Sequence, residues 1–179
     1  MAAVFALPLS AQAQESGGRE LRLGALLGWG EGPSATAAAG VRVGVGLGSG
    51  VALELEYSRW GHGIPGGCDG INPRCHGDGH LYLAGVAAGW PIMPRLEGHL
   101  QLNAGVHDLS GVPRGEAGAG PKASFAVDLG ARIEATDRVG FQVKGRFLDV
   151  FGDAAYTARV GEPLRYGMLM VGVEYALPI

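Results

Sequence analysis

Residues 123–148 read ASFAVDLGARIEATDRVGFQVKGRFL, and they show the alternation from which we predict the fold. Apolar side chains stand at every second position before and after the link TDR, and most positions between them are polar or glycine. Because successive side chains of a β-strand point to opposite faces of a sheet, two such runs joined by a tight link predict an antiparallel hairpin. Each run is about ten residues long, whereas strands of globular proteins average about 5–6 residues.

The same alternation recurs along the rest of the chain, while helical periodicity is nearly absent. Six further strands are expected at 20–29, 37–47, 51–59, 80–90, 96–107 and 167–177. In 80–90 both faces are small or apolar, and we favour one face that consists of Tyr82, Ala84, Val86, Ala88 and Trp90. Eight strands of this length suit a tilted crossing of a lipid bilayer, which takes about 9–11 residues per strand. The sequence has no apolar run long enough for a membrane helix.

The links between these strands alternate in length. Tight links occur at 48–50, 91–95 and 136–138, whereas long links span roughly 60–79, 108–121 and 150–164. In an up-and-down barrel this alternation places the long loops on one rim and the tight turns on the other.

The composition of the polar face indicates which side of the barrel meets solvent. That face consists largely of Gly, Ala and Ser with single charged groups between them. It carries fewer charged residues than a surface in contact with water normally does. A narrow eight-stranded lumen takes this mixture, because little side-chain volume fits inside. We therefore predict an all-β, eight-stranded antiparallel up-and-down transmembrane β-barrel with a polar, side-chain-filled lumen. The alternative is a soluble lipocalin-like ligand-binding barrel.

The charges on the polar face nearly balance, as expected for an enclosed network. The alternative is a set of ordinary solvent-facing charges. The predicted lumenal network consists of Arg22, Arg42, Glu54, Glu56, Glu97, His99, Asp128, Arg132, Glu134, Lys144, Arg146 and Glu174.

Aromatic residues lie near the ends of the expected strands. Two girdles of aromatic side chains anchor membrane barrels at the two interfaces; an aromatic core of a soluble protein is the alternative. We expect Trp29, Tyr57, Trp60 and Phe147 near the long-loop ends, and Trp90, Phe141 and Tyr175 near the tight-turn ends.

The chain begins with MAAVFALPLSAQAQ, an apolar segment followed by small residues at Ala11 and Ala13. This pattern is typical of a secretory signal peptide. We expect a signal peptide over 1–13, a periplasmic tail over 14–19 and the barrel over 20–179. The segment is short and lacks a basic start, so we expect the natural start codon to lie upstream. The alternative is a disordered apolar tail.

Over roughly 20–177 the chain resembles the small outer-membrane β-barrels of the OmpA/OmpX type, a porin-like group. The resemblance rests on the signal-like start, the eight long strands, the alternating loop lengths and the Gly-rich polar face. The end MVGVEYALPI is similar to the terminal strand by which such barrels are recognised for assembly, but departs from it because the group usually ends in an aromatic residue. The resemblance implies a monomer in the bacterial cell outer membrane. Its implied partners are outer-membrane lipid, periplasmic chaperones and the barrel-assembly machinery.

The loop sequence GCDGINPRCHGDGH over 67–80 contains both cysteines, Cys68 and Cys75. In an oxidising periplasm such a pair forms a disulfide, and closing a loop of this size contributes roughly 2.5 kcal/mol in the chain-entropy estimate. A metal site is the alternative. It would need reduced thiolates with His62, His76 or His80, and the cysteine spacing is wider than that of usual zinc sites.

Three functions are compatible with the sequence. The first is a non-enzymatic barrel with a narrow or closed lumen and a structural or surface-recognition role, in which the loops bind an extracellular protein or glycan. The second is a membrane-embedded lipid A-modifying enzyme, but no His follows His107 and no Ser follows Ser124. A hydrolase triad from His107, Asp108 and Ser110 is the remaining catalytic arrangement. The third is the soluble barrel. We predict the first, with no cofactor or metal, and the absence of a basic patch argues against a nucleic-acid partner.

Overall fold

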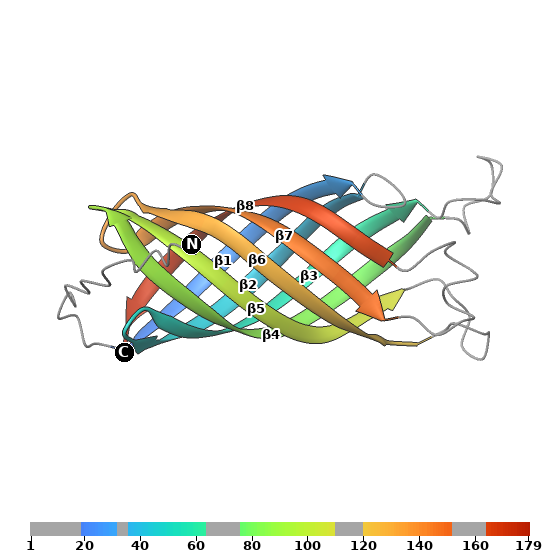
Figure 1. The fold of residues 1–179 in the computed structure, drawn as a ribbon, viewed down its shortest axis with the longest axis horizontal. Coiled ribbons are helices and arrows are strands. Elements are labelled where there is room, and N and C mark those ends of the chain that lie inside the picture. Colours follow the sequence, from blue (N-terminus) through green and yellow to red (C-terminus); the bar gives the residue numbers. More distant parts are fainter. Residues whose placement is uncertain (1–18, 32–35, 64–75, 110–119, 152–163) are drawn as a thin grey trace, which may run out of the picture.

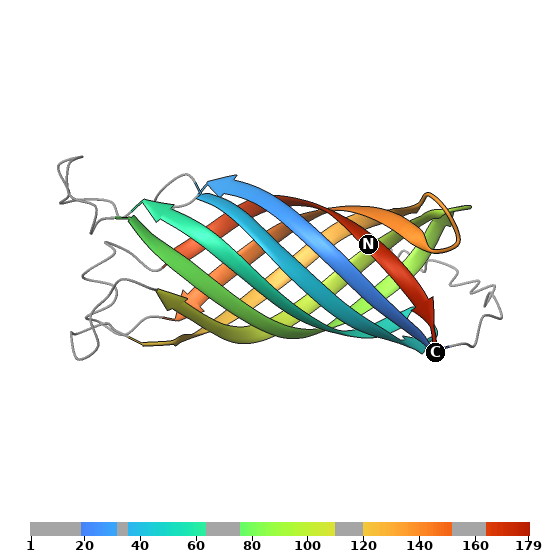
Figure 2. The ribbon, with the colours of Figure 1, turned by 180° about the vertical axis from the view of Figure 1, so that it is seen from behind.

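The computed structural model describes residues 19–31, 36–63, 76–109, 120–151 and 164–179. Within these ranges no helix is long and apolar enough to cross a membrane. The chain forms eight strands, drawn in Figure 1 and from behind in Figure 2: β1 (Glu20–Glu31), β2 (Thr36–Gly48), β3 (Val51–Gly63), β4 (His76–Met93), β5 (Leu96–Leu109), β6 (Lys122–Glu134), β7 (Val139–Phe151) and β8 (Leu164–Pro178).

The sheet closes on itself because β1 pairs with β8 as well as with β2. Strands adjacent in sequence are adjacent in the sheet, and each pairing is antiparallel. The closing pair is continuous from Glu20 opposite Pro178 to Glu31 opposite Gly167. A closed barrel leaves no free edge to pair with other chains. The predicted eight-stranded up-and-down barrel is therefore confirmed.

The two ends of the barrel differ. The links from β2 to β3, from β4 to β5 and from β6 to β7 lie at one end, together with the C-terminus (Figure 1). We call this end the turn rim. We call the opposite end the loop rim. The described strands end there on either side of the ranges 32–35, 64–75, 110–119 and 152–163.

The strands are longer than the sequence pattern predicts, and most of the extra length is at the loop rim. The hairpin of β3 and β4 keeps its pairing as far as Gly63 opposite His76. Apolar alternation marks only the part of a strand that contacts lipid or core. Backbone pairing continues beyond it, so the pattern underestimates the strand.

Successive side chains along each strand point alternately into the lumen and to the outer face. On β7, Gln142, Lys144 and Arg146 are buried, whereas Phe141 and Phe147 are about half exposed on the outer face. On β4, Tyr82, Val86 and Trp90 are on the outside, which settles the face that was ambiguous in the sequence. Polar side chains inside and apolar side chains outside are the arrangement of a membrane barrel.

Glycines on the inner face make room for long polar side chains on the neighbouring strand. A Cβ atom on Gly130 would lie 2.7 Å from the Cβ of Lys144, its cross-strand partner. A Cβ atom on Gly89 would collide with the carboxylate of Glu97. The high glycine content thus follows from filling a narrow lumen with charged groups.

The turn between β2 and β3 depends on left-handed backbone. Gly48, Ser49 and Gly50 have φ angles of 86°, 56° and 73°, a region that glycine enters without steric cost. The carbonyl of Gly50 accepts a hydrogen bond of 2.6 Å from the Gly89 amide. The turn is therefore tied to β4 on the turn rim.

Candidate functional site: the filled lumen

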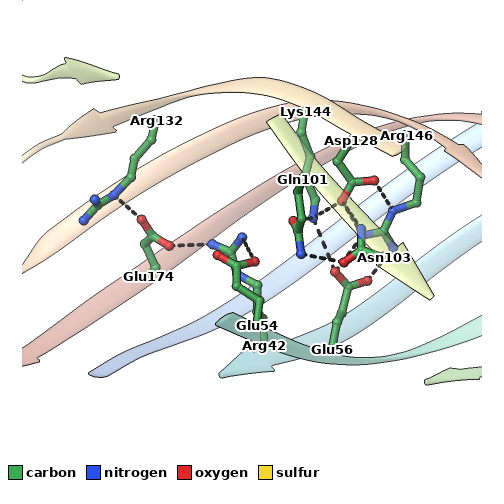
Figure 3. Close-up of polar contacts among 10 residues, drawn as sticks. All are labelled: Arg42, Glu54, Glu56, Gln101, Asn103, Asp128, Arg132, Lys144, Arg146 and Glu174. Carbon is green, nitrogen blue, oxygen red and sulfur yellow. Dashed lines mark hydrogen bonds and ion pairs between the residues drawn. The ribbon is translucent and has the colours of Figure 1, made fainter. Parts of the chain in front are cut away.

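The centre of the lumen contains a layer of four charged side chains, shown on the right of Figure 3. Arg146 on β7 donates two hydrogen bonds to Glu56 on β3 (2.5 and 2.7 Å) and two to Asp128 on β6 (2.7 and 2.6 Å). Lys144 donates to Asp128 at 2.7 Å and contacts Glu56 at 3.3 Å. Two carboxylates face two cations, so the layer has no net charge. We call these four residues the ionic layer.

Two amide side chains complete the ionic layer. Gln101 donates to the Asn103 side chain at 2.7 Å and accepts from Lys144 at 3.4 Å. Asn103 lies 3.5 Å from the Asp128 carboxylate. All six side chains are buried, and a buried charge is tolerated only when it is paired and hydrogen-bonded. Because β3 and β7 stand on opposite sides of the closed sheet, the layer connects the two walls across the lumen.

A second set of ion pairs lies nearer the turn rim, on the left of Figure 3. Arg42 on β2 donates to Glu54 at 2.9 Å and to Glu174 at 2.5 Å. Arg132 on β6 also pairs with Glu174 and lies 3.5 Å from Glu97. Glu174 therefore joins two arginines from different strands.

The remaining charges predicted for the lumen lie at its mouth on the turn rim. Arg22 pairs with Glu20 at 2.5 Å, and both side chains are partly exposed. Glu134 is exposed and lies 3.7 Å from Arg132. Of the twelve residues predicted for the network, Arg22 and Glu134 thus lie at the mouth, and Glu134 is exposed.

The loop-rim half of the lumen is filled mainly by apolar side chains, which the sequence did not lead us to expect; Ser58, His107 and Ser124 are buried in the same half. On each strand that contributes to both, these residues lie nearer the loop rim than the charged ones. We call this cluster the apolar collar: Leu26, Ala38, Trp60, Leu81, Leu83, Ala126, Leu148, Val150, Tyr166, Met168 and Met170.

Trp60 belongs to the apolar collar and not to an aromatic girdle. Its side chain is fully buried, donates to the Ser58 hydroxyl at 2.8 Å and meets the Tyr166 ring edge-on at 5.4 Å between centroids. The expectation that Trp60 lies at the membrane interface is therefore wrong. The alternation that places Glu54, Glu56 and Ser58 inside continues to residue 60. The phase of the strand therefore already indicates that the Trp60 side chain points into the lumen.

The other six aromatic residues predicted for the girdles lie on outward positions. Trp29 and Phe147 are exposed toward the loop rim, and Trp90, Phe141 and Tyr175 toward the turn rim. Tyr57 is partly covered by Tyr82, with 5.1 Å between ring centroids, and its hydroxyl lies 2.9 Å from Nδ1 of His80.

A small cavity lies inside the barrel between the ionic layer and the turn rim. Its volume is about 30 Å³, which is enough for about two water molecules. His99 and Gln142 line it. The Nε2 atoms of both side chains are buried and make no hydrogen bond within the described part of the chain. Sequence reasoning placed His99 in the lumen, but it gave no sign of the cavity.

The structure separates two members of the imagined hydrolase triad. His107 is buried in the lumen, whereas Asp108, the next residue along β5, is partly exposed on the outer face of the barrel. Adjacent residues of a strand point through opposite faces of the barrel wall, so these two cannot form a hydrogen-bonded relay. Ser110 lies outside the described residues.

Several sequence-based predictions fall beyond the described ranges. They concern the signal peptide over 1–13, most of the tail over 14–19, and the pair Cys68 and Cys75. The disulfide stays a prediction, which intact-mass measurement after thiol labelling with and without reduction would test. Two labelled thiols in the unreduced protein would contradict it.

Comparison with known proteins identifies the architecture. No family model matches the sequence, and no curated protein matches it. Among solved structures, Neisserial surface protein A is 13% identical, with 88% of this chain and 96% of that chain covered and a TM-score of 0.58. Outer membrane protein OprG from Pseudomonas aeruginosa is 9% identical, covers 89% and 96%, and has a TM-score of 0.54. The chain has the fold of the small outer-membrane β-barrels.

A designed protein shares this outer-membrane-barrel fold. A de novo designed transmembrane β-barrel is 10% identical, covers 88% of this chain and 95% of its own, and has a TM-score of 0.53. A fold that was also reached by design does not fix a biological role. The features that bear on function are therefore the lumen and the outer surface of this chain.

Proposed function

We propose that the chain is an integral protein of the bacterial outer membrane, non-enzymatic, with a closed lumen. Its role is structural or is surface recognition at the loop rim. The observation that carries this proposal is the filling of the lumen. The ionic layer and the apolar collar lie one behind the other, and each is made of side chains buried almost completely. An eight-stranded barrel is just wide enough to be filled in this way.

The outer surface supports the membrane location. In the described strands, outward positions between the two rims carry no charged side chain. Outward charges begin near the loop rim, at Arg59, Asp108, Asp149 and Arg165. An apolar band bounded by polar rows matches the profile of a lipid-facing barrel. A water-soluble barrel would expose this band at a large cost in hydrophobic free energy.

A non-enzymatic role is supported by the lumen chemistry. The charged groups in the lumen are engaged with each other, and the cavity on the turn side has space for only about two waters. A lipid-modifying site needs a nucleophile and a base that reach a substrate together. His107 and Asp108 project to opposite faces, so that pair does not supply such a site.

The recognition role is assigned to the loop rim, because connecting loops on a rigid scaffold are where binding residues concentrate. The described strands on either side of the long links predicted from the sequence end at this rim (Figure 1). The partner we propose is an extracellular protein or glycan, and the Cys68–Cys75 bridge would restrict the conformations of its binding loop.

Fractionation of cells tests the membrane proposal. We expect the protein in the outer-membrane fraction and soluble only in detergent, with faster migration on SDS gels before boiling than after, because a closed barrel resists SDS. Recovery of the folded protein from the aqueous fraction without detergent would contradict the proposal.

A further inference from the structure

We propose that the turn rim binds the phosphate group of an anionic phospholipid on the outer face of the barrel, between Arg19 and Arg138. The inference rests on the proposed membrane location. It goes beyond that proposal because it assigns a binding site and a headgroup class to the rim opposite the loops.

The two arginines flank the end of β8. The Ala176 amide donates to the Arg138 carbonyl at 2.7 Å, and the Ile179 amide donates to the Arg19 carbonyl at 3.1 Å. Arg138 lies directly before β7 and Arg19 directly before β1, the two neighbours of β8 in the sheet (Figure 2). The two backbones are therefore roughly 10 Å apart across β8 and offset by a similar distance along it. Two long side chains can reach one headgroup across this span from opposite sides.

Both arginines are on the lipid side of the barrel wall. The Arg138 guanidinium donates to the Tyr175 hydroxyl at 3.4 Å, and Tyr175 is 39% exposed on the outer face. Arg19 is exposed and continues the alternation phase of Leu23, an outward residue of β1. The two cations therefore lie outside the lumen, beside the aromatic residues of the turn rim.

Most carboxylates of the turn rim are already paired with arginines of the lumen. Glu20 pairs with Arg22 at 2.5 Å. Glu97 and Glu134 lie 3.5 and 3.7 Å from Arg132. The other charged side chains of this rim form no ion pair in the described part of the chain, and they are those of Arg19, Arg95, Asp137 and Arg138. Because three of these four are cations, they favour an anionic partner.

An apolar surface continues from the two arginines toward the middle of the barrel. Leu23 stands opposite Tyr175, and Phe141 stands opposite Val173. Leu23, Phe141 and Val173 are 41%, 52% and 43% exposed on the outer face. A phospholipid presents its groups in the same order, with the phosphate at the interface and the acyl chains toward the bilayer centre. This apolar surface is why the site is assigned to a lipid and not to a soluble phosphate.

Quenching of tryptophan fluorescence by brominated lipid measures which headgroup lies beside β8. Trp29→Phe and Trp90→Phe remove the outward tryptophans, and Phe141→Trp places one beside the site. Trp60 is kept, because it is buried in the lumen away from lipid. The folded protein, verified by heat-modifiable migration, is measured in phosphatidylcholine vesicles that contain a minor fraction of dibrominated phosphatidylglycerol or of dibrominated phosphatidylcholine.

We expect phosphatidylglycerol to associate at least about fivefold more strongly than phosphatidylcholine, since each basic residue near an anionic lipid surface contributes about this factor. Arg19→Gln combined with Arg138→Gln is expected to bring the ratio close to one. The matched control combines Arg95→Gln, in the turn between β4 and β5, with Arg165→Gln at the loop rim. It removes the same charge and is expected to leave the ratio unchanged.

Trp90 supplies a second reporter on the opposite side of the barrel. With Trp29→Phe and with Phe141 unchanged, quenching of Trp90 reports the lipid beside β4. The substitutions of Arg19 and Arg138 are expected to leave this signal unchanged. An equal fall at both reporters would indicate an effect of overall charge and would overturn the assignment of the site.

A ratio near one with both arginines present, or a ratio that survives their replacement, would also overturn the inference. In those cases a heat-modifiable barrel in the vesicles would leave the membrane location standing. A protein that does not insert into the vesicles would overturn the membrane proposal together with this inference.

Discussion

Replacement of Arg146 by alanine is expected to lower the free energy of unfolding by about 3–5 kcal/mol. The side chain makes four hydrogen bonds of 2.5–2.7 Å to Glu56 and Asp128. Without it, two buried carboxylates retain only Lys144 as a cationic partner. An uncompensated charge buried in the lumen is the main origin of the loss. Equilibrium unfolding by urea in lipid vesicles measures the effect.

The control for this variant is Arg165→Ala. Arg165 lies 3.4 Å from Asp149, but its side chain is 64% exposed on the outer surface near the loop rim. Exposed ion pairs contribute only about 0–1 kcal/mol, so a small change is expected. Equal losses in the two variants would contradict the assignment of Arg146 to an enclosed network.

Leu129→Arg is expected to destabilise the folded barrel by roughly 2–4 kcal/mol, the cost of arginine on the lipid face near the bilayer midplane. Leu129 lies in the middle of β6 and is 60% exposed. If this face met water, the same exposure would make the substitution nearly neutral, because surface changes in soluble proteins are usually within about 0.5 kcal/mol. The variant therefore distinguishes a lipid-facing surface from a water-facing one.

The matched control for Leu129→Arg is the same substitution at a residue near the end of the barrel. Leu47 is 53% exposed on the same outer face but lies at the end of β2 beside the turn rim. Arginine there is expected to cost about 0–1 kcal/mol, because the penalty falls near the interfaces. The comparison is made in the same vesicles and by the same urea titration. A loss at Leu47→Arg as large as at Leu129→Arg would indicate that the outer face does not follow bilayer depth.

The sequence was sufficient to predict the fold because one physical pattern, polar and apolar residues in alternation, recurs in all strands except 80–90. Alternation in 123–134 and 139–148 fixes both the strand and the face, and the lengths of the links fix the order of the strands. Since the inner face of a narrow barrel is crowded, its content of glycine and paired charges was also predictable. Gly130 beside Lys144 is one instance.

The arrangement inside the lumen could not be predicted in the same way. Which carboxylate meets Arg146 depends on the stagger of β3 against β7, strands on opposite sides of the barrel that share no hydrogen bonds. The inward apolar residues are divided among several strands in the sequence, as Leu26 on β1 and Met168 and Met170 on β8 illustrate. Only closure of the sheet brings them together in the apolar collar. Trp60 was misplaced because its position near a strand end suggested an interface, although the strand phase placed it inside. The cavity beside His99 and Gln142 depends on packing from several strands at once.

Ion conductance across a planar lipid bilayer shows whether the barrel is closed. The purified full-length protein is inserted at known protein density, with a general porin as the positive control for insertion and detergent alone as the negative control. The ionic layer and the apolar collar predict no steady conductance above that of detergent alone. Reproducible single-channel steps, present with this protein and absent with detergent, would show that the lumen is open.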